Sequence, residues 1–115
     1  MRFSDFLAEI SRFLDTGTLN LPGRECQVSD LTSRLVQACS LFEREKYKHL
    51  GDVSEGQTRL FCTVFSRTLF SVEPVEFQTK ILSLDSRSKD LILRGIEYSS
   101  KSFPNLDFSS YSRFL

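Results

Sequence analysis

The residues of this sequence that could carry out catalysis are a single histidine and three cysteines. A cysteine nucleophile uses a histidine that is distant in sequence, so His49 could activate Cys39 or Cys62 in a thiol enzyme. Both cysteines, however, lie among apolar residues at helical spacing, which is typical of an unreactive core thiol. We therefore expect no enzyme activity, and a thiol enzyme ranks third among the functions considered.

Signals for a metal or a cofactor are weaker still. One histidine is too few for a site with several histidine ligands. Neither of the glycine-rich phosphate-binding motifs, G-x-x-x-x-G-K-[ST] and G-x-G-x-x-G, occurs in the sequence. The spacings of Cys26, Cys39 and Cys62 fit neither a C-x-x-C metal site nor a disulfide framework, so we expect reduced, buried thiols. We expect no metal and no cofactor.

The strongest nucleic-acid signal is the run of residues 44–49, which contains three basic residues, His49 and an interleaved Tyr47. Glu43 and Glu45 dilute its positive charge, which favours the interpretation of a solvated helix end. A small helical nucleic-acid-binding protein that uses this basic patch is therefore the alternative function, and nucleic acid is a disfavoured partner.

Length and charge favour one domain of an ordinary globular protein. The chain has 115 residues, and its 15 basic and 15 acidic residues cancel, so no overall field attracts nucleic acid or a membrane surface. No apolar run approaches the roughly 18 residues of a membrane span. We expect an intracellular, cytoplasmic protein without membrane insertion.

Apolar residues recur at helical spacing through most of the chain. Residues 4–15 form the first predicted helix, which Gly17 ends, and residues 16–28 form an extended loop with Leu19 and Leu21 turned inward. Capping residues and a proline mark further helix starts. These starts are Ser29, Ser54, Pro74, and either Asp85 or Ser86.

The second and third predicted helices each carry an apolar stripe, and the second is expected to fray within residues 43–51. On the last helix, Gly95 is predicted to let another helix approach closely, because a glycine inside a helix otherwise costs about 1 kcal/mol relative to alanine. The residues of the two predicted stripes are Leu31, Leu35, Ala38, Cys39 and Phe42, then Leu60, Phe61, Val64, Phe65 and Leu69.

These signals predict an all-α fold, a single compact bundle of about five short amphipathic helices in residues 1–103. Residues 74–103 are expected to form a helical hairpin that closes the bundle. Residues 104–115 follow the last helix, which Pro104 ends, and form an aromatic C-terminal tail that is expected to dock on a partner or to cap the core.

The candidate partner-binding residues lie mostly in this tail. Phe108, Tyr111 and Leu115 are spaced to share one helical face, and Phe114 adds a further aromatic group. Leu93 is another candidate, since it lies near the charged edge of the last predicted helix. The alternative is that the tail covers the core of its own chain.

Residues 77–103 contain the pattern F-x3-I-L-x-L from Phe77 to Leu84, then L-x6-Y-x4-F from Leu91 to Phe103. This pattern resembles the end of the small helical amino-terminal domain of the COMM-domain family. The resemblance covers about the last 50 residues and implies a non-catalytic adaptor in a hetero-oligomeric assembly for endosomal recycling or ubiquitin-ligase regulation. The COMM domain itself, with its characteristic tryptophan, is absent, and this sequence contains no tryptophan.

The sequence thus favours a non-catalytic module for protein–protein interaction, an adaptor or scaffold. Its expected partners are proteins of unknown identity, and self-association is a further possibility. The residues that we expect to contact a partner are Leu93, Phe108, Tyr111, Phe114 and Leu115.

Overall fold

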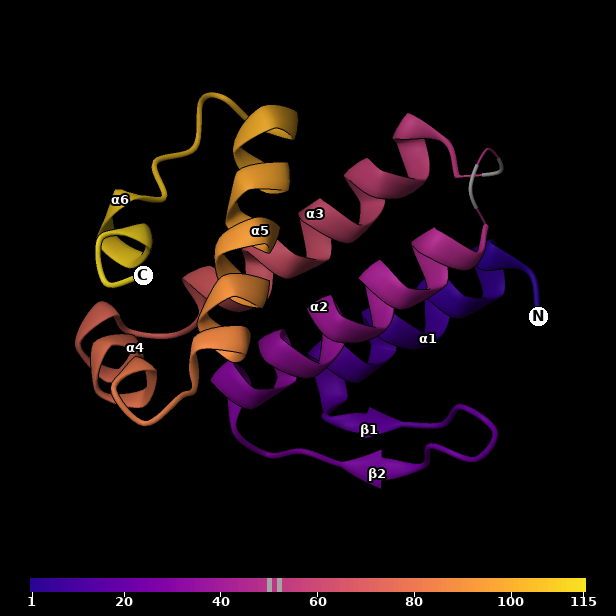
Figure 1. Ribbon diagram of the computed structural model, residues 1–115, viewed down its shortest axis with the longest axis horizontal. Coiled ribbons are helices and arrows are strands. Elements are labelled where there is room, and N and C mark those ends of the chain that lie inside the picture. The colour runs from indigo at the N-terminus through magenta and orange to yellow at the C-terminus, as the bar shows by residue number, and fades with distance from the viewer. Residues whose placement is uncertain (50, 52) are drawn as a thin grey trace.

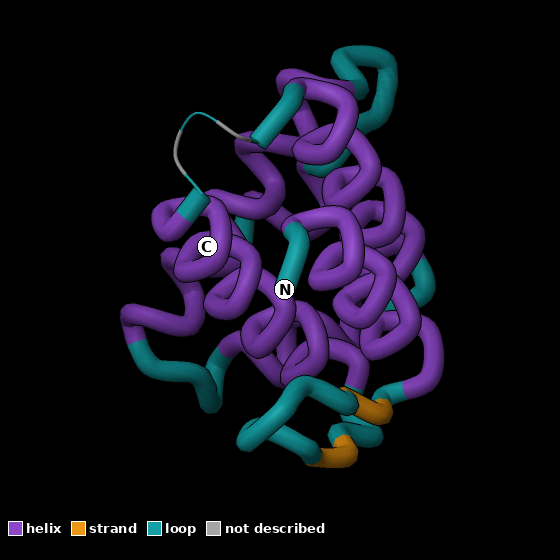
Figure 2. Tube along the Cα trace, turned by 90° about the vertical axis from the view of Figure 1, so that its right-hand side faces the viewer, coloured by secondary structure: helices purple, strands orange, loops and turns teal. Residues whose placement is uncertain are grey.

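The computed structural model describes every residue except Leu50 and Asp52, and within this part of the chain it contains six helices and one small sheet (Figures 1 and 2). The fold is therefore mostly helical, in agreement with the predicted all-α class. The helices are α1 (Phe3–Thr16), α2 (Leu31–Lys48), α3 (Glu55–Phe70), α4 (Pro74–Ile81), α5 (Ser86–Ser102) and α6 (Ser109–Ser112), and the strands are β1 (Thr18–Leu19) and β2 (Cys26–Gln27).

The helix boundaries follow from capping groups that the sequence displays. Ser54 and Gln57 form the predicted capping box of α3, in which each side chain accepts a hydrogen bond from the backbone N–H of the other residue. Asp85 caps α5, and Pro74 occupies the first turn of α4. At α2 the cap is Asp30 rather than the predicted Ser29, because the Asp30 carboxylate reaches the N–H three residues ahead at 2.9 Å.

The C-terminal end of α2 extends further than expected. The helix continues to Lys48, and the His49 N–H closes it by donating to the Glu45 carbonyl at 3.1 Å. The predicted fraying within residues 43–51 is therefore wrong up to Lys48, and Leu50 lies outside the described residues.

A tight turn after α1 leads into the small two-stranded sheet, in a segment that was expected to be an extended loop. Gly17 ends α1 with a φ of +83°, and its carbonyl accepts a hydrogen bond from the Val28 N–H at 2.7 Å. Arg34 on α2 reaches back and donates to the Val28 carbonyl at 2.6 Å. The segment between Gly17 and Val28 returns as the antiparallel pair β1–β2. Leu19 and Leu21 are buried, as predicted.

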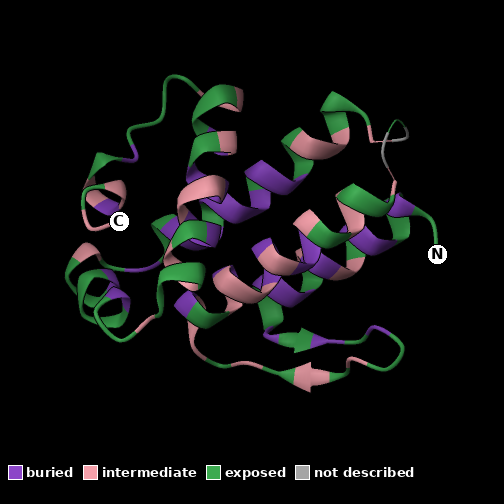
Figure 3. Ribbon diagram, in the orientation of Figure 1, coloured by how far each residue is buried: buried purple, intermediate pink, exposed green. Residues whose placement is uncertain are grey.

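The helices α1, α2 and α3 pack against one another, and α5 packs across α2 and α3 (Figure 1). Buried and exposed residues alternate at helical spacing along these helices, so each presents one apolar face to the interior (Figure 3). The interior is dominated by phenylalanine. The residues with the largest fully buried side chains include Phe6, Phe13, Phe42, Phe65 and Phe77.

Two packing expectations need correction. The predicted apolar stripe of α3 includes Leu60, but this side chain is 49% exposed, because the buried face of α3 runs through Phe61, Cys62 and Phe65. Residues 74–103 were expected to form a hairpin in which two helices close the bundle together. Instead, α4 packs mainly against α6, whereas α5 packs against α2 and α3.

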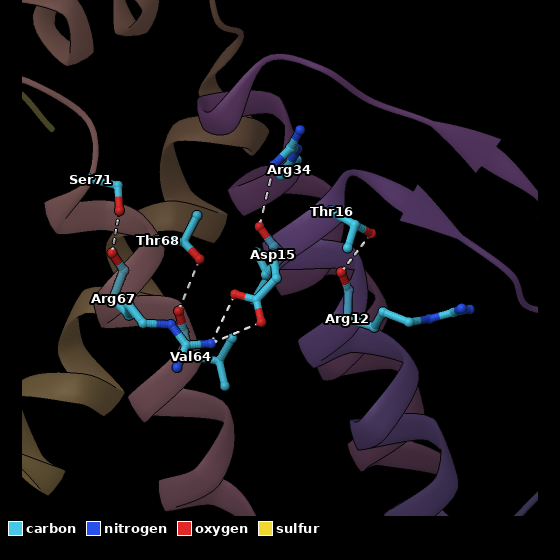
Figure 4. A network of polar contacts seen from close by, with 9 residues as sticks. Arg12, Asp15, Thr16, Arg34, Val64, Arg67, Thr68 and Ser71 are labelled. Atoms are coloured by element: carbon cyan, nitrogen blue, oxygen red, sulfur yellow. Dashed lines mark hydrogen bonds and ion pairs between the residues drawn. The ribbon is translucent and has the colours of Figure 1, made fainter.

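Polar contacts join the end of α1 to α3 on the outside of the molecule (Figure 4). Arg67 donates to both carboxylate oxygens of Asp15, at 2.8 and 3.0 Å. Both side chains are more than half exposed, so water screens this pair and it adds little stability. The packing of the apolar faces therefore holds α1 against α3.

The helix α5 approaches its neighbours closely at Gly95, as predicted. A Cβ atom at this position would lie 2.8 Å from the edge of the Phe65 ring and 3.0 Å from Cys39 Sγ. Both distances are shorter than van der Waals contact, so any side chain at residue 95 would push α5 away from α3 and α2.

We predict that Gly95→Ala lowers the free energy of unfolding, measured by urea denaturation, by up to about 2 kcal/mol. Overpacking typically costs roughly 1–3 kcal/mol, which exceeds the gain of about 1 kcal/mol in helix propensity. Gly56→Ala is the matched control, because a Cβ atom at residue 56 would have the Ser54 hydroxyl as its nearest neighbour, at an ordinary 3.8 Å. Equal stabilisation of both variants would contradict the close approach.

Candidate protein-binding site

The aromatic tail packs on its own chain. Phe108 and Tyr111 are 5% and 4% exposed. The Tyr111 ring meets Phe77 edge to face at 5.2 Å, and Phe70 lies 5.2 Å from Phe108. Two of the predicted partner-binding residues are thus buried in the same molecule, because the end of α3 and the inner face of α4 need an apolar cover that the other helices do not supply.

Tyr111 is also fixed by a hydrogen bond. Its hydroxyl donates to the Val72 carbonyl at 2.6 Å, across 39 residues of sequence. Burial, together with the charge of Glu73, raises the pKa of the Tyr111 hydroxyl above its ordinary value. The hydroxyl therefore stays protonated at neutral pH and keeps its role as a donor.

The last residues do not form the predicted helical face. The helix α6 ends at Ser112, so Leu115 does not continue its register. Phe114 and Leu115 are partly buried against the core cluster, and the Arg113 guanidinium lies 5.0 Å from the centre of the Phe114 ring. These two side chains keep some exposed surface, unlike Phe108 and Tyr111.

Docking of the tail leaves a pocket between α5 and α6, which we call the α5–α6 pocket. It has a volume of about 510 Å3, and its apolar wall is formed by Leu93, Ile96 and Phe108. Five polar residues complete its lining, namely Glu97, Ser100, Lys101, Ser109 and Ser112. The structure thus brings together two of the predicted residues, Leu93 and Phe108, which are 15 positions apart in the sequence.

The basic run of residues 44–49 is partly neutralised. Lys48 Nζ and His49 Nε2 both lie 3.4 Å from carboxylate oxygens of Glu45. Lys46 turns away from them, and its Nζ lies 4.9 Å from the centre of the Tyr98 ring on α5. The run therefore does not form one continuous basic surface.

Lys46 instead lines a second pocket, which we call the basic pocket. It has a volume of about 540 Å3 and lies where the end of α2, the start of α3 and the end of α5 meet. Arg59 and Lys101 line it together with Lys46, and Glu55 is the acidic residue of its described lining. No pattern in the sequence marks this cluster, since its cations come from three separate helices and each follows the ordinary spacing of a solvated face.

Glu43 on α2 and Arg94 on α5 form a closer ion pair than those of Glu45. The Arg94 guanidinium donates to both carboxylate oxygens of Glu43, at 2.6 and 3.0 Å. This pairing raises the pKa of Arg94, and burial raises the pKa of the Tyr98 hydroxyl. Both carboxylate oxygens of Glu43 are therefore hydrogen-bonded to Arg94.

Cys39 and His49, a pair that a thiol enzyme could use, have different neighbours. Cys39 is buried beside Gly95, and burial raises the pKa of its thiol far above the ordinary value. His49 contacts Glu45 and packs its ring 5.6 Å from that of Phe3. All three cysteines are free thiols, but Cys26 is only partly buried, which corrects the expectation of three buried ones.

The described residues contain no group of three or more His, Cys, Asp or Glu side chains placed to hold a metal ion. Within the same residues, every helix is too short or too polar to cross a lipid bilayer. Comparison with protein-family models, curated proteins and solved structures finds no match for this chain. The class that the structure itself shows is a small, mostly helical protein with two pockets that are both lined by Lys101.

We predict that Tyr111→Phe lowers the free energy of unfolding by roughly 1–3 kcal/mol, because it removes the buried donor to the Val72 carbonyl. Thermal and urea unfolding would measure the change. Tyr47→Phe is the control, since the Tyr47 side chain is 76% exposed and should show no effect. An unchanged stability of Tyr111→Phe would mean that the hydrogen bond to the Val72 carbonyl does not stabilise the fold.

We predict that Cys39 resists a thiol reagent at neutral pH until the protein unfolds, because its buried thiol has a raised pKa and stays protonated. Labelling followed by mass spectrometry would give the rate at each cysteine. The partly exposed Cys26 should react first and serves as the internal control. Labelling of Cys39 as fast as that of Cys26 would contradict this prediction and support a reactive thiol.

Proposed function

We propose that this protein is a non-catalytic module for protein–protein interaction, and that a partner binds in the α5–α6 pocket. The observation that carries the proposal is the convergence of Leu93, Ile96 and Phe108 on one pocket of about 510 Å3 whose lining is otherwise polar. Apolar groups next to polar ones can take an apolar side chain and fix its orientation. An adaptor role inside the cell, in an assembly of the COMM type, belongs to the same proposal.

The arrangement of supporting residues favours such a role. The pocket is formed by a long helix, α5, and by a tail that Tyr111 fixes to the Val72 carbonyl. A site on packed elements loses little conformational entropy on binding, which favours affinity. The burial of Cys39, which raises the pKa of its thiol, supports the absence of thiol chemistry.

The alternative of nucleic-acid binding through residues 44–49 receives less support. Within this run, Glu45 lies beside both Lys48 and His49, and Lys46 turns to the Tyr98 ring, so the cations do not form one continuous row for a phosphate backbone. The α5–α6 pocket, by contrast, offers an apolar wall that nucleic acid does not need.

We predict that a selection from a displayed library of 12-residue peptides yields binders with a bulky apolar residue, and that Leu93→Asp weakens these binders at least tenfold. The charge would lie in the apolar wall of the pocket, where it is costly to desolvate. Fluorescence polarisation with the selected peptides would measure affinity.

Leu82→Asp is the matched control, because Leu82 is 78% exposed and lies just after α4, outside the pocket. It should leave binding unchanged, and circular dichroism should show that both variants stay folded. Peptides that bind Leu93→Asp as well as they bind the unsubstituted protein would rule out this pocket as the site.

A further inference from the structure

The α5–α6 pocket and the basic pocket share one residue, Lys101. The two pockets therefore lie next to each other along α5, one with an apolar wall and the other with basic residues. Leu93 and Lys101 are eight residues apart, which corresponds to about 12 Å along a helix. A partner that occupies the first pocket would present its neighbouring residues to the second.

Among the described residues, the lining of the basic pocket carries an excess of two positive charges. It contains Lys46, Arg59 and Lys101, and Glu55 is the acidic residue of this described lining. None of the ion pairs found among the described residues includes any of these three cations. The chain as a whole is neutral, so this local excess stands out from its surroundings.

Aromatic rings hold two of the cations in place. Lys46 Nζ lies 4.9 Å from the centre of the Tyr98 ring, and Arg59 Cζ lies 5.1 Å from that of Phe103. A ring attracts a cation through its quadrupole but brings no net charge, so both residues remain able to pair with an anion. Their side chains are also partly ordered in advance, which reduces the entropy lost on binding.

We propose that the basic pocket binds a phosphorylated serine or threonine of the protein partner. This inference rests on the proposed function. A phosphate monoester carries about 1.5 to 2 negative charges at neutral pH, which matches the excess of the pocket better than one carboxylate does. Thr58 and Ser102 in the lining add hydroxyl groups that can donate to its oxygens.

The spacing of the two pockets defines the sequence pattern of the partner. An extended peptide advances roughly 3.3 Å per residue, so about 12 Å corresponds to three or four residues. The partner should therefore carry a bulky apolar residue and, three or four positions away, the phosphorylated residue. Glu97, which lies on α5 between Leu93 and Lys101, should disfavour an acidic residue between these two positions.

A nucleic acid would use the same cations differently. It needs a series of basic contacts along its backbone, whereas Glu55 lines the basic pocket together with the three cations and Glu97 lines the adjoining pocket. A mixed apolar and anionic segment of a protein fits the two adjoining pockets better.

The test compares two degenerate peptide libraries by fluorescence polarisation against the full chain. One has the fixed pattern Leu-x-x-x-phosphoserine, and the other has serine in place of phosphoserine. We expect the phosphorylated library to bind about tenfold or more tightly at low salt, because charge-assisted hydrogen bonds add to the apolar contact. Arg59→Gln and Lys101→Gln should each remove most of this advantage. Arg87→Gln, an equal loss of charge in the exposed first turn of α5, should preserve it.

A second measurement tests the anion site without the apolar contact. Titration of the isotope-labelled protein with inorganic phosphate should shift the amide resonances near Lys101 in the unsubstituted protein, but not in the double variant Arg59→Gln/Lys101→Gln. Equal affinity of the two libraries, with dependence on Leu93, would overturn the phosphate inference and leave the proposed function intact. Phosphate shifts without any Leu93-dependent peptide binding would overturn the proposed function and, with it, the inferred partner.

Two further outcomes count against the inference. A library with aspartate in place of phosphoserine that binds equally well would show that any acidic residue suffices. A single-stranded oligonucleotide that binds more tightly than the phosphorylated library, with a steep salt dependence and through Arg59 and Lys101, would make nucleic acid the ligand of the basic pocket.

Discussion

The structure depends on the close crossing of α5 over α3 and α2. At Gly95 the backbone of α5 comes so near to the Phe65 ring and Cys39 Sγ that no side chain fits between them. The buried Ser99 hydroxyl donates to the Gly95 carbonyl at 2.8 Å, which satisfies a polar group where water is excluded. This crossing fixes the position of α5, and α5 contributes residues to both pockets.

The second constraint is the unfinished core at the end of α3 and along α4. Without the tail, Phe77 and the Val72 carbonyl would lose the ring and the hydroxyl of Tyr111 that now contact them. The tail is aromatic because it completes this part of the core. The α5–α6 pocket follows from this packing, since the return of the tail places Phe108 in the same pocket wall as Leu93.

Local signals predicted the helices well because caps act within three or four residues. The capping box at Ser54 and the stop at Gly17 follow from such short-range chemistry. The close approach at Gly95 was predicted from the residue type, because a glycine inside a helix is otherwise unfavourable, but its neighbours Phe65 and Cys39 were not. The sheet, the cover formed by Tyr111 and the meeting of Arg59 with Lys101 depend on residues that are distant in sequence. Spacing along the chain carries no information about such meetings, and Leu60 shows that even a predicted stripe can be one residue too wide.

The difference between local signals and contacts of distant residues also explains how a chain with no net charge can contain a charged site. A basic run such as residues 44–49 is visible in the sequence, yet its acidic neighbour Glu45 lies within reach of Lys48 and His49. Arg59 and Lys101 also follow an acidic residue by four positions, Glu55 and Glu97, yet neither cation takes part in an ion pair among the described residues. Lys46 is part of the basic run in the sequence and also of the basic pocket, because its side chain extends to the Tyr98 ring on α5. Charge that tertiary packing assembles can therefore be more available to a ligand than charge that is contiguous in the chain.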